Sequence, residues 1–459
     1  MDLGLLARVM RLRPRLRASE RWTRAALERH QADRLSALRA YAYERSPFYR
    51  RFHAGVFDRP LAELPILTKA NLMDHFDDVV TDRSIRLADV EAHLAAVTGD
   101  QRFARRYRVV STSGTTGRRG IFLADPTEWA TVIASYNRAQ EWAGVSPSLL
   151  RRTRLAVVST TTGWHQSARV GASVRNPLVL TLRLDATDPL PATVARLNEF
   201  QPDSLIGYAS MQRLLAEEQL AGRLRIAPRA VISAAEVLTD DTRQQITDAY
   251  GRAPFNVYAA TESAGIASEC ENHAGLHLYE DLVITEIVDE AYGPVAPGAF
   301  GARILVTVLS SRTQPLIRYE LSDSVRLAST GPCPCGRTFA LLDGIQGRRE
   351  DVVELPHGSG GTISIHPLVF HDVLDRVPAG EWQVVQDGID LRLLVAVPGP
   401  DFDGDATVAA ILRGVQALGA RPGSVTWQEV PSIPRTAAGK APLVKADRSA
   451  PDGVRGRAP

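Results

Sequence analysis

Short apolar runs rich in β-branched residues alternate with helix-like stretches through the middle of this chain, from Leu155 to Val288. The runs include Leu155–Val158, Ser204–Ile206, Ala230–Ile232 and Phe255–Tyr258. Strands separated by helix-length segments are typical of parallel sheets with helical crossovers. The pattern therefore predicts an α/β fold in which a mostly parallel sheet is flanked by helices.

The segments on either side of this region predict the remaining organisation. Residues 1–55 mix Arg and Leu at helical spacing, which indicates amphipathic helices on the outside of the larger domain. Strand-like runs dominate about residues 265–345, which indicates a β-rich subdomain. We expect a large N-terminal domain with mixed and parallel sheets over residues 1–351, and a small α+β domain over 352–448. A disordered tail is expected over 449–459.

The composition narrows the functional classes. A chain of 459 residues with 44% hydrophobic and 23% charged residues is typical of a globular protein with more than one domain. A net charge of +2 gives no reason to expect nucleic acid or an anionic membrane as a partner, and no apolar run is long enough for a membrane span. The Arg-rich start, Met1–Arg17, lacks the apolar core of a secretory signal, and three cysteines do not form a disulfide scaffold. We expect a cytoplasmic protein, and a homodimer is compatible with the sequence.

A loop rich in Ser, Thr and Gly spans Ser111–Gly120 and follows a strand-like pair of valines. Backbone N–H groups and hydroxyls in such a loop can surround a polyphosphate, because glycine lets the chain approach closely. The loop lacks the Lys that a Walker A motif places after its glycines, and a flexible linker is the alternative. The candidate phosphate-binding residues are Ser111, Ser113, Gly114, Thr115, Thr116 and Gly117.

A second polar segment follows another strand-like run. It places an aromatic side chain, a hydroxyl and a carboxylate close together as Tyr258, Thr261 and Glu262. Open α/β sheets bind ligands at the carboxyl ends of their strands, and carboxylate oxygens suit Mg²⁺. A buried tyrosine and a solvated glutamate are the alternative. Asp323, after a later strand, and Lys440, in a Gly-Lys pair, are further candidates that would otherwise be a turn residue and a surface residue.

The three cysteines form a candidate metal site with a histidine. Cys333 and Cys335 lie close together, and Cys270 comes earlier in the chain. Three thiolates and one imidazole make a closed tetrahedral site, which is the usual arrangement of structural zinc. Either His277 or His273 can supply the fourth ligand, and three buried thiols without metal are the alternative. A closed site has no open coordination position, so we expect a structural role.

Five short motifs occur in a fixed order along the chain. They are Ser111–Gly120, Tyr258–Glu262, Arg318–Asp323, Gly347–Asp351 and Thr436–Lys440. Together they resemble the motifs of the adenylate-forming enzyme superfamily, most closely those of its phenylacetate–coenzyme A ligase-like branch. Other segments similar to that branch are Leu64–Lys69, Ile206–Tyr208, Ala235–Leu238, Gly275–His277 and Cys333–Arg337.

The resemblance implies an AMP-forming ligase that uses ATP and Mg²⁺ and releases pyrophosphate. Thr261 would contact the α-phosphate, and Glu262 would ligate Mg²⁺. Lys440 would stabilise the charge that develops on the phosphate, so the three residues would form the catalytic set. Asp351 would be the hinge about which a mobile C-terminal domain rotates.

The resemblance also implies a set of nucleotide contacts. Thr115 and Thr116 would be among the donors to the β- and γ-phosphates, Tyr258 would pack on adenine, and Asp323 would hold the ribose. The other implied contacts are Ala235, Glu236, Ala259 and, near the hinge, Arg348.

The chain departs from that branch at two places. Ser233-Ala234-Ala235-Glu236 stands where the relatives usually carry a pair of glycines before the glutamate, which is a change between small residues. After the hinge, residues 356–367 replace the Arg-Gly-Val-Asn-like stretch that lines the thiol tunnel in coenzyme A ligases. The second departure leaves open whether coenzyme A or an amine is the acceptor, and it does not affect adenylation.

These patterns predict a ligase that adenylates a small, aromatic carboxylic acid and transfers it to coenzyme A or an amine. The composition is compatible with a bacterial source and secondary metabolism. One alternative is a diazotase-type enzyme that activates nitrite for reaction with an aromatic amine, and another is an inactive nucleotide-binding homologue that acts as a scaffold. The candidate substrate residues are Trp164, His165, Tyr208 and Ala260, although a surface loop is an equal explanation of the first two.

Overall fold

The structure is a computed structural model that describes residues 2–112, 119–146, 152–173, 176–329, 331–348, 351–434 and 443–446. The chain divides into two compact units. The large unit contains Met1–Leu238 and Ile246–Ile345, and the small unit contains Thr239–Gln245 and Gln346–Pro459. Within the described ranges, no helix combines the length and the apolarity that a membrane crossing requires.

A nine-stranded sheet forms the centre of the large unit, with the strand order β13-β14-β9-β8-β7-β6-β5-β3-β4. Neighbouring strands from β7 to β4 are parallel, and β7 to β8, β8 to β9 and β9 to β14 are antiparallel. The predicted mostly parallel α/β sheet is thus confirmed. The strands are β3 (Thr153–Ser159), β4 (Val179–Asp185), β5 (Ser204–Gly207), β6 (Ala230–Ala234), β7 (Phe255–Ala260), β8 (Ala264–Glu269), β9 (Leu276–Leu278), β13 (Asp323–Leu327) and β14 (Leu341–Arg348).

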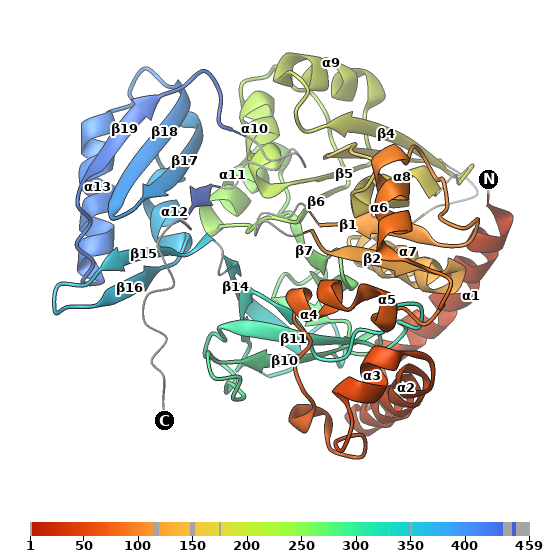
Figure 1. Ribbon diagram of the computed structural model, residues 1–459. Coiled ribbons are helices and arrows are strands. Elements are labelled where there is room, and N and C mark those ends of the chain that lie inside the picture. The colour runs from red at the N-terminus through yellow and green to blue at the C-terminus, as the bar shows by residue number, and fades with distance from the viewer. Residues whose placement is uncertain are drawn as a thin grey trace. The chain divides into compact units, whose positions relative to one another are not determined.

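Helices cover both faces of the parallel part of this sheet. The contacts of two successive residues of β6 illustrate this arrangement. Val231 packs against Ala216 on one face, whereas Ile232 packs with Ala139 on the other. Successive strand residues point to opposite faces, so a strand buried on both sides becomes apolar throughout. Figure 1 shows α9 and α10 beside these strands. The helices are α7 (Pro126–Trp142), α8 (Gln166–Ser173), α9 (Leu190–Phe200), α10 (Ala209–Leu220) and α11 (Asp240–Tyr250).

The β-rich part contains a second, antiparallel sheet with the order β10-β11-β12. Its strands are β10 (Val283–Val288), β11 (Arg303–Val308) and β12 (Tyr319–Leu321), and a separate hairpin joins β1 (Arg108–Ser111) to β2 (Ile121–Ala124). The loop predicted to bind phosphate begins at the end of β1. Its residues Ser113, Gly114, Thr115, Thr116 and Gly117 lie outside the described residues.

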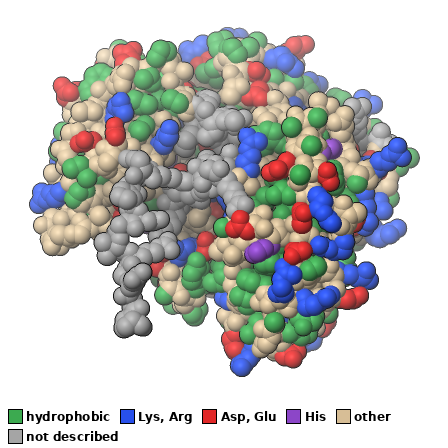
Figure 2. All heavy atoms as spheres, viewed as in Figure 1, with side chains coloured by type: hydrophobic (Ala, Val, Ile, Leu, Met, Phe, Trp, Pro, Cys, Tyr) green, Lys and Arg blue, Asp and Glu red, His purple; other side chains and the backbone are tan. Residues whose placement is uncertain are grey.

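The N-terminal segment is helical. It contains α1 (Leu3–Ser19), α2 (Arg24–Arg45), α3 (Pro47–Phe52), a 3₁₀ turn (Leu61–Glu63), α4 (Lys69–Asp74), α5 (Phe76–Val79) and α6 (Leu87–Ala96). Helix α1 packs against α7 and buries Leu5, Val9 and Leu16. Acidic and basic side chains are interspersed over the face of the large unit that Figure 2 shows, in keeping with the net charge of +2.

The small unit has an α+β fold of its own. Its four-stranded sheet has the order β19-β18-β17-β20, and a separate hairpin joins β15 to β16. The core includes Trp382, Phe370 and Ile411. The elements are β15 (Val353–Pro356), β16 (Thr362–Ile365), α12 (Leu368–Leu374), β17 (Ala379–Asp387), β18 (Asp390–Pro398), α13 (Gly404–Ala417), β19 (Val425–Glu429) and β20 (Val444–Lys445).

A capping box fixes the start of α7. The Asp125 carboxylate accepts hydrogen bonds from the backbone of Thr127 and Glu128, and the Glu128 side chain accepts one from Asp125 N at 2.6 Å. We expect Asp125→Ala to lower the free energy of unfolding of the large unit by about 1 kcal/mol, because two N–H groups lose their acceptor. Asp125→Asn keeps a cap oxygen and is expected to stay near wild type. Urea denaturation followed by tryptophan fluorescence tests both variants, and equal losses would assign the effect to the charge and not to the cap.

Candidate functional site

The carboxyl ends of four parallel strands lie along one edge of the sheet, and polar or aromatic residues follow each of them. This is the edge at which open α/β sheets bind ligands. The segments that follow β3, β5, β6 and β7 carry Trp164 and His165, Tyr208, Ala235 and Glu236, and Thr261 and Glu262, in that order. The fold thus brings predicted residues that are far apart in the sequence to the same edge.

The turn between β7 and β8 holds Thr261 and Glu262, and other segments contact it on both sides. Gln166, at the start of α8, donates from Nε2 to Thr261 O at 3.1 Å, and Tyr136 of α7 donates to Gln166 Oε1 at 2.6 Å. The Tyr319 hydroxyl of β12 lies 3.5 Å from Glu262 Oε1. The turn is therefore positioned by residues of α7, α8 and the Arg318–Asp323 motif.

The segment after β3 is held in place by the end of β4. The backbone N–H and the hydroxyl of Thr161 both donate to Asp185 Oδ2, at 2.8 and 2.5 Å. Although burial acts in the opposite direction, hydrogen bonds from Thr161 and Thr187 lower the pKa of Asp185 to about 2. A carboxylate that stays ionised is a strong acceptor, so Asp185 fixes the start of this segment.

The same segment reaches the base of the loop predicted to bind phosphate. Ser111 N donates to Trp164 O at 3.0 Å, and the Arg119 guanidinium lies 4.7 Å from the centre of the Trp164 ring. Trp164 also contacts the ring of His165, with centroids 4.6 Å apart. The predicted substrate segment therefore contacts the two described ends of the predicted phosphate loop, at Ser111 and Arg119.

Tyr208 and Tyr258 are both buried at this edge. The Tyr208 hydroxyl accepts a hydrogen bond from Thr160 N at 3.1 Å, and burial raises the pKa of Tyr208 to about 12. The Tyr208 hydroxyl therefore serves as an acceptor within the protein. Ala259 and Ala260 end β7 and add little bulk.

The turn after β6 contains the alanine that stands near the glycine positions of the relatives. Ala235 has a φ of +68°, and the next residue, Glu236, accepts a hydrogen bond from Ser210 N at 2.9 Å. A left-handed conformation costs a residue with a Cβ roughly 1–2 kcal/mol. Ala235 therefore adopts a backbone conformation that its side chain disfavours.

The remaining predicted residues divide between the two units. Asp323 is buried at the start of β13 in the large unit. Arg348 ends β14, and it belongs with Asp351 to the small unit. Lys440 lies outside the described residues.

The candidate metal ligands Cys270, His277, Cys333 and Cys335 lie close together, with all their ligand atoms within 4.8 Å of one another. The sulfur atoms of Cys270 and Cys333 are 3.6 Å apart, near the spacing of about 3.8 Å that tetrahedral Zn–S bonds of about 2.3 Å require. The Cys335 sulfur lies 3.3 Å from His277 Nε2. These four residues could hold a metal ion.

Two hydrogen bonds distinguish the histidines. His277 Nδ1 lies 3.2 Å from the carbonyl oxygen of Phe339, which leaves Nε2 facing the sulfur atoms, whereas His273 Nδ1 lies 3.1 Å from Glu269 Oε2. Metal-binding histidines commonly donate from their other nitrogen in this way. Burial raises the pKa of the Cys270 thiol to about 12.

Comparisons with known proteins indicate the class of protein to which this chain is similar. No protein-family model matches the chain. It is 28% identical over 375 residues to a phenylacetate–coenzyme A ligase of Thermus thermophilus, covering 77% of this chain and 76% of that protein. It is 29% identical over 346 residues to a phenylacetate–coenzyme A ligase of Escherichia coli, covering 71% of this chain and 72% of that protein. A solved structure of 2-hydroxyisobutyryl-CoA ligase in complex with R3-HIB-AMP has a TM-score of 0.73 at 20% identity, covering 94% of this chain and 91% of that one.

The fold is thus the fold of the adenylate-forming enzymes. Within that superfamily, the sequence is similar to the phenylacetate–coenzyme A ligase-like branch, and these relatives support AMP-forming ligase activity. The resemblance expected from the five motifs is confirmed.

The left-handed conformation of Ala235 gives a direct test of local strain. We expect Ala235→Gly to raise the free energy of unfolding by about 1 kcal/mol, because glycine adopts a positive φ without steric cost. Ala234→Gly is the matched control, since the backbone of Ala234 is that of a strand and the change should destabilise. Chemical denaturation measures both, and a loss of stability in Ala235→Gly would show that the turn carries no such strain.

Proposed function

We propose that this ligase adenylates a small aromatic carboxylic acid with ATP and then transfers the acyl group to coenzyme A. The observation that carries the proposal is the convergence of separate motifs on the Thr261–Glu262 turn, through Gln166 from one side and Tyr319 from the other. In-line attack on the α-phosphorus places negative charge on its non-bridging oxygens, and such charge requires donors and cations held in fixed positions. The phenylacetate–coenzyme A ligases among the relatives support the acid and the acceptor.

Residues of the large unit would bind the nucleotide. Thr261 would donate to the α-phosphate, Tyr258 would pack on adenine, and Asp323 would accept hydrogen bonds from the ribose. The Glu262 carboxylate, beside the Tyr319 hydroxyl, is the hard oxygen ligand that Mg²⁺ prefers, and Mg²⁺ would neutralise part of the phosphate charge. The other nucleotide contacts would come from Ser111, Ser113, Gly114, Thr115, Thr116, Gly117, Ala235, Glu236 and Ala259.

Residues of the small unit would complete the chemistry. Lys440 would place its ammonium beside the α-phosphate and the attacking carboxylate. Asp351 would be the hinge, with Arg348 contacting the nucleotide next to it. Rotation about such a hinge lets one unit serve two half-reactions in turn.

The acid pocket would be lined by rings and small residues. Trp164, His165 and Tyr208 supply aromatic surface at the sheet edge, and Ala260 leaves space beside the Thr261–Glu262 turn. Aromatic rings pack edge-to-face or offset with centroids about 4.5–7 Å apart, which suits an aryl acid.

The hairpin after the hinge supports a second candidate acceptor. Residues Val353–Pro356 and Thr362–Ile365 pair as β15 and β16, and β16 with the turn before it lies in the stretch, residues 356–367, that departs from the coenzyme A ligases. If this hairpin does not line a thiol tunnel, an amine would take the acyl group in place of coenzyme A.

Pyrophosphate release tests the proposal. ATP, Mg²⁺ and a panel of aryl acids, fatty acids and nitrite are supplied in turn, each alone, with coenzyme A and with an aromatic amine. We expect release with an aryl acid and thioester formation when coenzyme A is present. Amide formation would assign an amine acceptor, a response to nitrite with an amine would assign a diazotase, and no response to any substrate would favour a scaffold.

Two variants test the residue roles in the same assay. Glu262→Gln and Lys440→Ala are each expected to lower the rate about a hundredfold or more, which corresponds to roughly 2–4 kcal/mol of lost transition-state stabilisation. Lys445→Ala is the matched control, because it removes an exposed lysine of the same unit. Wild-type rates of adenylate formation in both test variants would contradict these roles.

We also propose that Cys270, His277, Cys333 and Cys335, together called the Cys₃His cluster, bind structural Zn²⁺. Three thiolates and an imidazole are a usual structural zinc set, and they leave no open position for catalysis. Elemental analysis should find one zinc per chain in the wild type and in His273→Ala, and close to none in Cys333→Ser. Circular dichroism of each sample shows whether the variant is folded. Loss of zinc from His273→Ala with retention in Cys333→Ser would contradict the assignment.

A further inference from the structure

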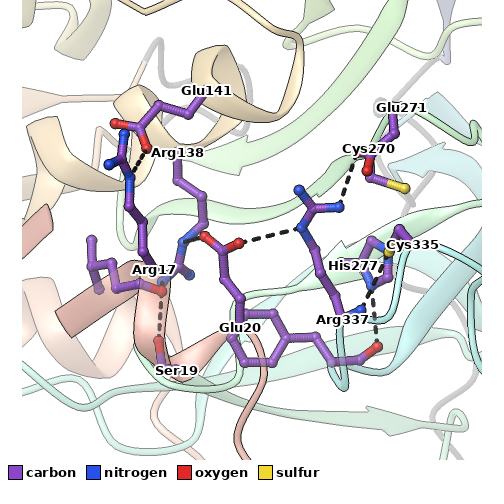
Figure 3. Close-up of polar contacts among 12 residues, drawn as sticks. Arg17, Ser19, Glu20, Arg138, Glu141, Cys270, Glu271, His277, Cys335 and Arg337 are labelled. Atoms are coloured by element: carbon purple, nitrogen blue, oxygen red, sulfur yellow. Dashed lines mark hydrogen bonds and ion pairs between the residues drawn. The ribbon is translucent and has the colours of Figure 1, made fainter. Parts of the chain in front are cut away.

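We infer that the Cys₃His cluster anchors the N-terminal helices through Arg337 and Glu20, so that metal occupancy sets how firmly the end of α1 is held. The inference rests on the proposed metal site, and it is independent of the identity of the acid. Figure 3 shows Arg337 between the cluster and Glu20, and Arg138 on the other side of Glu20.

Arg337 connects the cluster to the body of the large unit. Its backbone N–H donates to the Cys335 sulfur at 3.4 Å. Its guanidinium lies 3.4 Å from Glu20 Oε2 and 2.9 Å from Glu271 Oε2, and it stacks 4.6 Å from the centre of the Trp142 ring. One residue therefore touches a candidate metal ligand and the residue that ends α1.

Glu20 is attached to the same loop a second time. Its carbonyl oxygen accepts a hydrogen bond from Thr338 N at 3.0 Å, next to Arg337 in the sequence. Both contacts depend on where residues 333–338 lie. Those residues are joined to β8 and β9 by the cluster itself, through the approach of Cys333 to Cys270 and of Cys335 to His277. The position of this loop should accordingly depend on the metal.

The charge of the filled site strengthens this connection. A divalent cation with three thiolates and a neutral imidazole carries a net charge of −1, whereas three thiols and an imidazole are neutral. The backbone N–H of Arg337 donates to the Cys335 sulfur, so filling the site places a negative charge close to this arginine. The metal thus favours the position of Arg337 from which Glu20 is held.

A second attachment of α1 does not involve the cluster. Arg138 forms two hydrogen bonds to Asp281, at 2.8 and 2.7 Å, and donates to Leu16 O at 3.2 Å. Ser19 donates to the same Asp281 carboxylate at 2.5 Å. Metal removal should therefore loosen the end of α1 without releasing the whole helix.

Hydrogen exchange with mass spectrometry tests the anchor, with the metal content measured in the same samples. Chelation of the wild type is expected to accelerate exchange roughly tenfold in peptides that cover residues 16–23, because hydrogen bonds to a charged group are lost. Exchange over residues 331–340 should rise with it. Unchanged exchange over 16–23 in a metal-free sample would overturn the inference.

Two variants separate the anchor from general stability. Glu20→Gln should speed exchange over 16–23 while the metal is still bound, and chelation should then add much less than in the wild type. Glu141→Gln is the matched control, because Glu141 pairs with Arg13 and Arg17 of α1 but does not touch the cluster. It should keep the full response to chelation. Equal responses of the two variants, or a chain that binds no metal, would overturn the inference, whereas failure of the ligase proposal would appear only in the pyrophosphate assay.

Discussion

The buried ion pair between Arg138 and Asp281 joins three parts of the large unit that are far apart in the sequence. It connects α7 to the segment before β10, and through Ser19 it also connects α1. Although burial alone would raise it, the pKa of Asp281 lies below its ordinary value because of Arg138. Buried pairs add little over an apolar contact, yet a single partner left alone costs about 3–5 kcal/mol. An arrangement of the N-terminal helices, α7 and the β-rich part that separated Arg138 from Asp281 would therefore be strongly disfavoured.

Helix α7 connects the Arg138–Asp281 ion pair to the candidate functional site. Its first turn is capped beside β2, and Ala139 packs on the parallel sheet. Tyr136, two positions before Arg138, orients Gln166 and through it the Thr261 carbonyl. A site formed by turns at strand ends has little rigidity of its own, because such turns bury few side chains. The helix supplies the fixed reference against which the Thr261–Glu262 turn is placed.

The parallel sheet could be predicted because apolar runs in the sequence indicate strands. The close approach of the cysteines could be predicted because a short spacing between cysteines is typical of metal ligands. The choice between His273 and His277 as the fourth ligand could not be predicted from the sequence, because it depends on the pairing of His277 with Leu341 across β9 and β14. Asp185 was missed for a similar reason, because β4 is an edge strand with exposed side chains and a weak apolar pattern. The contact of Ser19 with Asp281 could not be predicted either. The two residues are far apart in the sequence, so no local sequence pattern reports their contact.

The division of the chain into two units separates most of the proposed nucleotide-binding residues from the hairpin that follows the proposed hinge. Thr261, Glu262 and Asp323 belong to the large unit, whereas Arg348, Asp351 and the β15–β16 hairpin belong to the small one. The proposed binding of ATP and an acid uses the polar turns of the large unit, and these turns contain motifs that resemble those of the superfamily. The second departure from the coenzyme A ligases, over residues 356–367, lies in the small unit. A change there can alter the acceptor while the chemistry of adenylation stays as it is, because transition-state stabilisation depends on groups that the hairpin does not supply.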